Sequence, residues 1–140
     1  MQEDIRNELK KELLWIRYQR YRELKRWRSL LPELKRAIHH VLPDAEIYVF
    51  GSAVREELTA NSDVDVLVVS PEAVGRKRHQ LASDIEEEVD KLTTLPIFEI
   101  HLVPPQKLEW FAKHVKELVS IDELIRHKQF WSARAETANP

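Results

Sequence analysis

The chain has 140 residues, of which 43% are hydrophobic and 33% are charged. This length is sufficient for one compact domain with an apolar core and is short for two. With 22 basic and 24 acidic residues, the net charge of −2 excludes a whole-molecule attraction to nucleic acid or to an anionic membrane, so such a partner would need a local patch. The absence of cysteine excludes disulfides, zinc–thiolate sites and thiol nucleophiles.

The sequence also argues against a membrane location. Its longest apolar runs, such as Val66 to Val69, are only a few residues long, whereas a membrane-spanning helix needs roughly 20. The N-terminus is charged from Glu3 onward and has no apolar signal core. We therefore expect a cytoplasmic protein with no membrane partner.

The first 42 residues are predicted to form two helices. An apolar stripe with spacings of three, four or their multiples predicts one long amphipathic helix from Ile5 to Trp27, interrupted on its apolar face by Arg20. Pro32 suits the first turn of a second helix over residues 32–41, because proline needs no amide donor there. We expect residues 1–42 to be a helical extension that packs on the core.

Residues 43–127 are predicted to form that core, and residues 128–140 a flexible tail. Short runs rich in β-branched and aromatic residues predict strands, and apolar stripes with helical spacing predict helices. The expected elements are a strand at 46–50, a short helix at 53–59, a strand at 64–69, a helix at 76–92, a strand at 97–103 and a helix at 107–127. The fold class is therefore α/β (α+β), with a small mixed sheet of at least three strands flanked by helices and a long N-terminal helix.

Two acids open the second predicted strand. Because side chains alternate along a strand, Asp63 and Asp65 point to the same face while Val64 points into the core. At about 6 Å and an effective dielectric constant of about 20, two carboxylates repel by roughly 2–3 kcal/mol. A divalent cation would reverse the sign of this energy, and carboxylate oxygens suit Mg²⁺ or Mn²⁺.

Two further features complete a candidate site. The first strand ends in Gly51-Ser52, and the short helix expected after it would offer backbone N–H groups and a hydroxyl to the phosphates of a nucleotide. Glu99 lies between apolar residues in the third predicted strand, where a buried acid without a partner would be costly, and we expect it to hold the catalytic metal with the two aspartates. By alternation His101 shares the face of Glu99, but we interpret it as a hydrogen-bonded neighbour and not as a catalytic residue.

This combination resembles the DNA polymerase β-type nucleotidyltransferase superfamily, whose pattern is Gly-Ser, a spacer, Asp-x-Asp and a later acid between apolar residues. The ten residues between Ser52 and Asp63 are similar to the spacer of minimal nucleotidyltransferases, including the antitoxins that act beside HEPN-domain toxins. The resemblance covers about residues 45–105. It implies ATP or another NTP as substrate, Mg²⁺ as cofactor, and transfer of a nucleotide monophosphate to a hydroxyl of a protein or nucleic acid, in the antitoxins a tyrosine of the toxin.

Two alternatives stay open from the sequence. One is a binding subunit that keeps the fold and neutralises a HEPN-type partner by contact alone. The other is an RNA-binding module that uses the N-terminal helix, where nine basic residues from Arg6 to Arg28 alternate with aromatic side chains. We favour a protein contact for this helix, either with a partner or with a second copy of the chain, because acids are mixed with the bases and the apolar spacing is regular.

Overall fold

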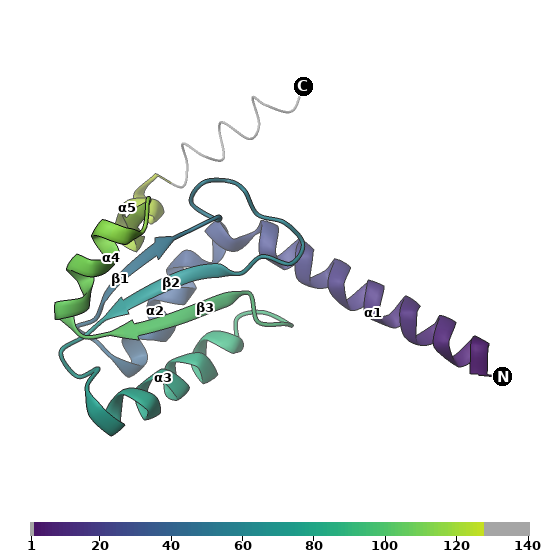
Figure 1. The fold of residues 1–140 in the computed structure, drawn as a ribbon, viewed down its shortest axis with the longest axis horizontal. Coiled ribbons are helices and arrows are strands. Elements are labelled where there is room, and N and C mark those ends of the chain that lie inside the picture. Colours follow the sequence, from purple (N-terminus) through teal and green to yellow (C-terminus); the bar gives the residue numbers. More distant parts are fainter. Residues whose placement is uncertain (1, 128–140) are drawn as a thin grey trace.

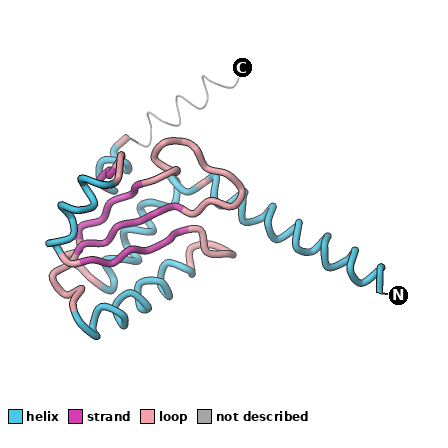
Figure 2. Tube along the Cα trace, viewed as in Figure 1, coloured by secondary structure: helices cyan, strands magenta, loops and turns pink. Residues whose placement is uncertain are grey.

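The computed structural model describes residues 2–127, and the predicted tail at 128–140 lies outside them. Figures 1 and 2 show a sheet covered by helices, with the first helix extending away from it. The helices are α1 (Gln2–Lys25), η1 (Trp27–Leu30), α2 (Leu31–Val41), α3 (Gly75–Asp90), η2 (Pro105–Lys107), α4 (Leu108–His114) and α5 (Ile121–Arg126). The strands are β1 (Glu46–Phe50), β2 (Val64–Val69), β3 (Phe98–Val103) and β4 (Leu118–Ser120).

The strands form one mixed sheet in the order β3-β2-β1-β4. β1 is antiparallel to both β2 and β4, whereas β2 and β3 are parallel and are connected through α3. The predicted α/β class, with a small mixed sheet flanked by helices and a long N-terminal helix, is confirmed. The parallel pair matters for function because it places residues 65 and 99 directly opposite each other.

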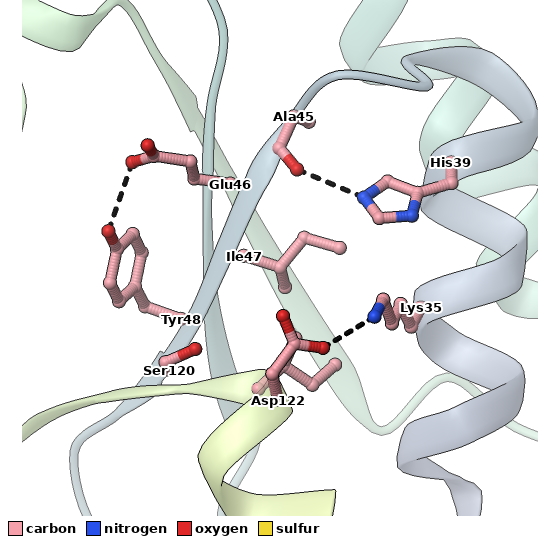
Figure 3. A pocket seen from close by; sticks show the side chains of 9 residues that line it. Lys35, His39, Ala45, Glu46, Ile47, Tyr48, Ser120 and Asp122 are labelled. Atoms are coloured by element: carbon pink, nitrogen blue, oxygen red, sulfur yellow. Dashed lines mark hydrogen bonds and ion pairs between the residues drawn. The ribbon is translucent and has the colours of Figure 1, made fainter.

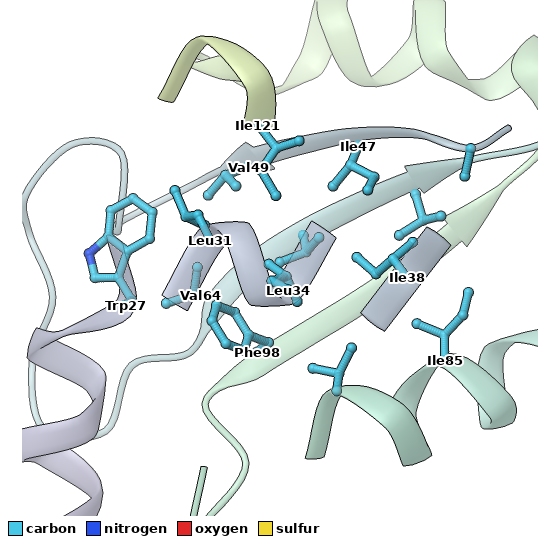
Figure 4. Close-up of a cluster of buried hydrophobic side chains, with 14 of the residues drawn as sticks. Trp27, Leu31, Leu34, Ile38, Ile47, Val49, Val64, Ile85, Phe98 and Ile121 are labelled. Atoms are coloured by element: carbon cyan, nitrogen blue, oxygen red, sulfur yellow. The ribbon is translucent and has the colours of Figure 1, made fainter. Parts of the chain in front are cut away.

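The larger core lies between the sheet and the helices α2 and α3. Along β2, Val64, Val66 and Val68 point to this side, while Leu67 and Val69 belong to a smaller cluster on the other side of the sheet. In α2 the apolar residues recur every three or four positions, so that Leu34 and Ile38 are fully buried against the strands (Figure 4). β2 is therefore apolar on both faces except at Asp65, which is partly exposed.

Helix α1 makes few contacts with the rest of the molecule. Every residue from 2 to 18 is exposed, and within α1 only Leu24 is buried. The segment 1–42 was expected to pack on the core, and only its part from about residue 19 onward does so. The predicted apolar stripe exists, but the residues Ile5, Leu9, Leu13 and Ile16 all face solvent.

We expect deletion of residues 2–18 to leave the melting temperature of the remaining domain within about 2 °C, because exposed side chains contribute little to stability. Circular dichroism melts of the full and shortened chains measure this. A decrease above about 5 °C, or one that grows with protein concentration, would contradict the expectation and would mean that the stripe is covered by a second copy in solution.

The predicted helix at 53–59 is wrong. Residues 51–56 form successive turns, in which Arg55 N–H donates to the Gly51 carbonyl and Glu57 N–H donates to that of Ser52. Glu56 has a φ of 60°, a left-handed conformation that no right-handed helix contains. The turn after β1 is therefore irregular, and phosphate binding at a helix N-terminus does not apply to it.

The predicted helix at 107–127 is also wrong in part. It is divided into α4, β4 and α5, because the backbone becomes extended at Val115 (φ −105°, ψ 128°). Leu118, Val119 and Ser120 then pair with β1. Apolar residues in this segment fit a helical stripe equally well, but strand pairing satisfies the hydrogen-bonding groups along the free edge of β1.

Glu23 connects the end of α1 to the loop before β3. Its carboxylate accepts hydrogen bonds from the backbone N–H groups of Thr94, at 2.9 Å, and Leu95, at 3.4 Å. Burial is the largest single effect and raises the pKa of Glu23, but the hydrogen bonds from Thr94 and Leu95 together outweigh it and lower the pKa below its ordinary value of 4.5. This contact helps to hold α1 at the sheet edge that carries the predicted site.

Because its pKa is lower in the folded state, Glu23 stabilises the fold above pH 4.5, and this stabilisation is lost as the pH falls through the lowered pKa. We expect Glu23→Gln to cost about 1 kcal/mol at pH 7 and less near pH 3. Urea unfolding at both pH values tests this, with exposed Glu12→Gln on the same helix as the control. An equal cost at both pH values would contradict the role of the charge.

Candidate active site on the β2–β3 edge

The site is built where β1 ends and where β2 and β3 run side by side. Asp65 is paired in register with Phe50 of β1 on one side and with Glu99 of β3 on the other. Because residues that are opposite each other in a sheet share a face, the carboxylates of Asp65 and Glu99 emerge together. The predicted convergence of these two acids therefore exists in the structure.

His101 joins this pair. Its Nε2 lies 3.3 Å from Asp65 Oδ1 and 3.9 Å from Glu99 Oε1. Ligand atoms of Asp65, Glu99 and His101 all lie within 4.8 Å of one another, which is the spacing of a candidate metal site. Alternation along β3 predicts that His101 shares the face of Glu99, and its contact with Asp65 agrees with the interpretation of His101 as a hydrogen-bonded neighbour.

The electrostatics of the cluster fit a site for a cation. The neighbouring Asp65 carboxylate, by hydrogen bonding to the protonated form, raises the pKa of Glu99, and partial burial adds to this effect. The hydrogen bond to Asp65 likewise raises the pKa of His101 against the opposing effect of burial. The two carboxylates share a face and repel each other, and a positive ion bound between them would remove this repulsion.

Gly51 forms the wall of the site beside Asp65. It has a φ of 83°, and a Cβ at this position would lie 2.7 Å from Asp65 Oδ2. Glycine is therefore required here both for the backbone conformation and for the space that Asp65 occupies. In the turn that follows, the backbone N–H groups of Ser52, Ala53 and Val54 donate to no backbone carbonyl of residues 2–127.

Asp63 is not part of the compact cluster. It precedes β2, its side chain is 48% exposed, and its Oδ1 accepts a hydrogen bond from Arg20 Nη2 of α1. The prediction of a site formed by Asp63, Asp65 and Glu99 alone is therefore incomplete, because an arginine 43 residues away pairs with the first acid. The only sequence signal for Arg20 was its position within the apolar stripe of the helix.

A separate pocket of about 280 Å³ lies near the beginning of β1 (Figure 3). Its polar side chains are already paired: Lys35 with Asp122, His39 with the carbonyl of Ala45, and Tyr48 with Glu46. Since these groups satisfy one another, the pocket offers no set of free polar groups for a ligand. The better candidate for chemistry is the surface formed by Asp65 and Glu99 beside the turn after β1, which we call the acidic edge.

A mixed sheet, a Gly-Ser turn after β1 and acids on the neighbouring parallel strands β2 and β3 suit the transfer of a nucleotide. The chain belongs to the nucleotidyltransferase domain family, whose model matches residues 30–127. Its members usually use an NTP and a divalent metal. No curated protein matches the chain in sequence.

Two solved structures are similar to the chain. The crystal structure of a "putative nucleotidyltransferase" has a TM-score of 0.50 and 22% identity, over 64% of this chain and 94% of that one, and supports the fold. A "putative nucleotidyltransferase" from Sulfolobus solfataricus has a TM-score of 0.48 and 19% identity, over 73% of this chain and 85% of that one. Within residues 2–127, none of the helices has both the length and the apolar character needed to cross a bilayer.

Proposed function

We propose that this protein transfers a nucleoside monophosphate, AMP from ATP or its equivalent from another NTP, to a hydroxyl of a protein or nucleic-acid acceptor. The observation that carries the proposal is the pairing of Asp65 with Glu99 on adjacent parallel strands, directly beside Gly51. Two carboxylates on one face of the sheet repel each other, and a bound cation would relieve this repulsion. Family membership supplies the class of reaction, and the acceptor is part of the proposal.

The donor groups fit Mg²⁺ or Mn²⁺. Asp65 and Glu99 offer carboxylate oxygens within 4.8 Å of each other and of a His101 nitrogen, and hard divalent ions prefer such oxygens together with substrate phosphates. In our proposal Asp63 and Asp65 hold the metal and Glu99 completes the catalytic position. The bound ion would neutralise charge on the reacting phosphates and would make the acceptor hydroxyl more acidic. His101 would orient Asp65 through their hydrogen bond.

The remaining chemistry is mostly positioning. The turn from Gly51 to Val54 would bind the β- and γ-phosphates through backbone N–H groups that donate to no backbone carbonyl of residues 2–127 and through the Ser52 hydroxyl. Glu99 has a raised pKa and would accept the proton of the acceptor hydroxyl. The hydroxyl oxygen then attacks the α-phosphorus in line, and pyrophosphate leaves from the opposite side.

The exposed stripe of α1 supports a protein as the partner. Nine large hydrophobic side chains are exposed within residues 2–127, and seven of them lie on α1: Ile5, Leu9, Leu13, Leu14, Trp15, Ile16 and Tyr18. Four of them, Ile5, Leu9, Leu13 and Ile16, recur every three or four residues and so share one face of the helix, and an exposed apolar face of this kind usually marks an interaction site. We propose that this helix contacts a HEPN-type protein, which would supply the acceptor hydroxyl, and that the protein acts in the cytoplasm.

The test is transfer of label from α-labelled ATP with Mg²⁺ to a candidate HEPN-type partner. We expect the partner to be labelled by the wild-type chain and not by the Asp63→Asn, Asp65→Asn double variant. If the double variant still neutralises the partner and neither protein ever transfers label, a contact-only function replaces the enzymatic one.

An RNA-binding module has less support. Among the nine basic residues from Arg6 to Arg28, Arg20 is bound to Asp63 and Arg28 to Glu56, so these two are not freely available to phosphates. RNA binding that weakens steeply with salt and with loss of Arg17, Arg20 and Arg28 would nevertheless favour the module.

A further inference from the structure

Arg20 of α1 connects three separate points around the acidic edge. Its Nε donates to the carbonyl of Pro96 at 3.1 Å, its Nη1 to that of Ala60 at 3.3 Å, and its Nη2 to Asp63 Oδ1. The side chain is 19% exposed, much less than the rest of the projecting helix. A guanidinium presents several donors in a fixed plane, and here they hold together the loops that precede β2 and β3.

The ion pair with Arg20 sets the surroundings of the Asp63 carboxylate. The carboxylate has a positive partner in the protein itself, and it lies outside the compact group of Asp65, Glu99 and His101. In the proposed function the same carboxylate contributes to cation binding. A guanidinium and a divalent ion would then act on one carboxylate while repelling each other.

We propose that Arg20 is a positioning residue that competes with the divalent cation for Asp63. Cation binding at the acidic edge and the Arg20–Asp63 ion pair oppose each other, and the coupling between them is reciprocal. This inference rests on the proposed cation site. It requires neither a particular nucleotide nor a particular acceptor.

The coupling can be measured without nucleotide, by calorimetric titration of the whole chain with MnCl₂. We expect Arg20→Gln to tighten Mn²⁺ binding about tenfold at low ionic strength, because Asp63 then loses the guanidinium that competes for its carboxylate. The gain should decrease in 0.3 M NaCl, where exposed charges are screened. Arg22→Gln removes the same charge from an exposed position on the same helix and should change the affinity less than twofold.

Two further variants separate competition from a merely structural role. Arg20→Lys keeps the charge but loses the planar set of donors, so it should retain the wild-type affinity for Mn²⁺ within about threefold. In an Asp63→Asn background, Arg20→Gln should change the affinity less than twofold, because the contested carboxylate is absent. Thermal melts establish that each variant is folded, and a moderate decrease is expected when Ala60 and Pro96 lose their donor.

Three outcomes would overturn the inference. The first is an Mn²⁺ affinity of folded Arg20→Gln that is unchanged, weaker or undetectable. The second is an Arg20→Lys protein that binds Mn²⁺ as Arg20→Gln does. The third is a gain in Mn²⁺ affinity from Arg20→Gln that persists in the Asp63→Asn background. The proposed reaction fails separately: tighter Mn²⁺ binding by Arg20→Gln, together with no transfer of label by any form of the protein, would contradict nucleotidyl transfer and leave the role of Arg20 intact.

Discussion

Asp65→Asn is expected to remove divalent-cation binding and nucleotidyl transfer while leaving the fold intact. Asp65 is the central group of the site, since it lies opposite Glu99 and is hydrogen-bonded to His101. Its Oδ2 also lies 2.7 Å from the point where a Cβ on Gly51 would be. Loss of a direct carboxylate ligand should weaken Mn²⁺ binding by at least about 100-fold, because even outer groups around a metal contribute 10- to 100-fold. Calorimetric titration with MnCl₂ and label transfer measure the two effects.

The same variant should move the pKa of Glu99 downward, toward its ordinary value, because the Asp65 carboxylate is the main cause of its increase. An NMR titration of the Glu99 carboxyl carbon measures this shift. Stability should change little, since the repulsion with Glu99 and the ionic hydrogen bond with His101 are lost together. Asp44→Asn, at an exposed turn before β1, is the control and should change none of these quantities. An Asp65→Asn protein that binds Mn²⁺ normally would contradict the site.

Gly51→Ala is expected to damage both the fold and the site. A non-glycine residue at a φ of 83° costs about 1–2 kcal/mol. In addition, the new Cβ would lie 2.7 Å from Asp65 Oδ2, so the carboxylate would have to move away from its place beside Glu99. We expect Mn²⁺ affinity and label transfer to fall at least about tenfold, beyond the loss in unfolding free energy.

The chain offers a matched control for this substitution. Gly75 also has a positive φ, of 60°, but no atom lies within 4 Å of the position that its Cβ would take. Gly75→Ala should therefore cost about 1 kcal/mol of stability and leave cation binding unchanged. Chemical unfolding and Mn²⁺ titration of both variants separate the backbone cost from the steric one. Equal effects on Mn²⁺ binding would show that the close approach to Asp65 has no functional role.

Local patterns were sufficient for the central strands and for two of the acids. Val64, Val66 and Val68 alternate with Asp65 and Leu67, so the sequence predicts which face each residue takes. Glu99 between Phe98 and Ile100 follows the same rule. The pairing of the two strands in parallel register then brings Asp65 and Glu99 together.

Elements at the margins of the sheet depended on contacts that are distant in the sequence. The segment 118–120 has apolar residues that suit a helix or a strand, and the free edge of β1 decides in favour of a strand. The sequence predicts a helix at 53–59 and not the turns observed at 51–56, because sequence spacing contains no information about the positive φ of Glu56.

By itself, the sequence determined how apolar and acidic residues alternate along each strand and where the Gly-Ser turn lies. These features depend on alternation and on short spacings, and they indicated the class of chemistry. Only the tertiary structure decided that His101 joins the cluster and that Arg20 pairs with Asp63. The physical reason is that an ion pair between residues 20 and 63 depends on where a long helix ends relative to the sheet. That position results from packing around Leu24 and from the hydrogen bonds of Glu23, which no local pattern contains.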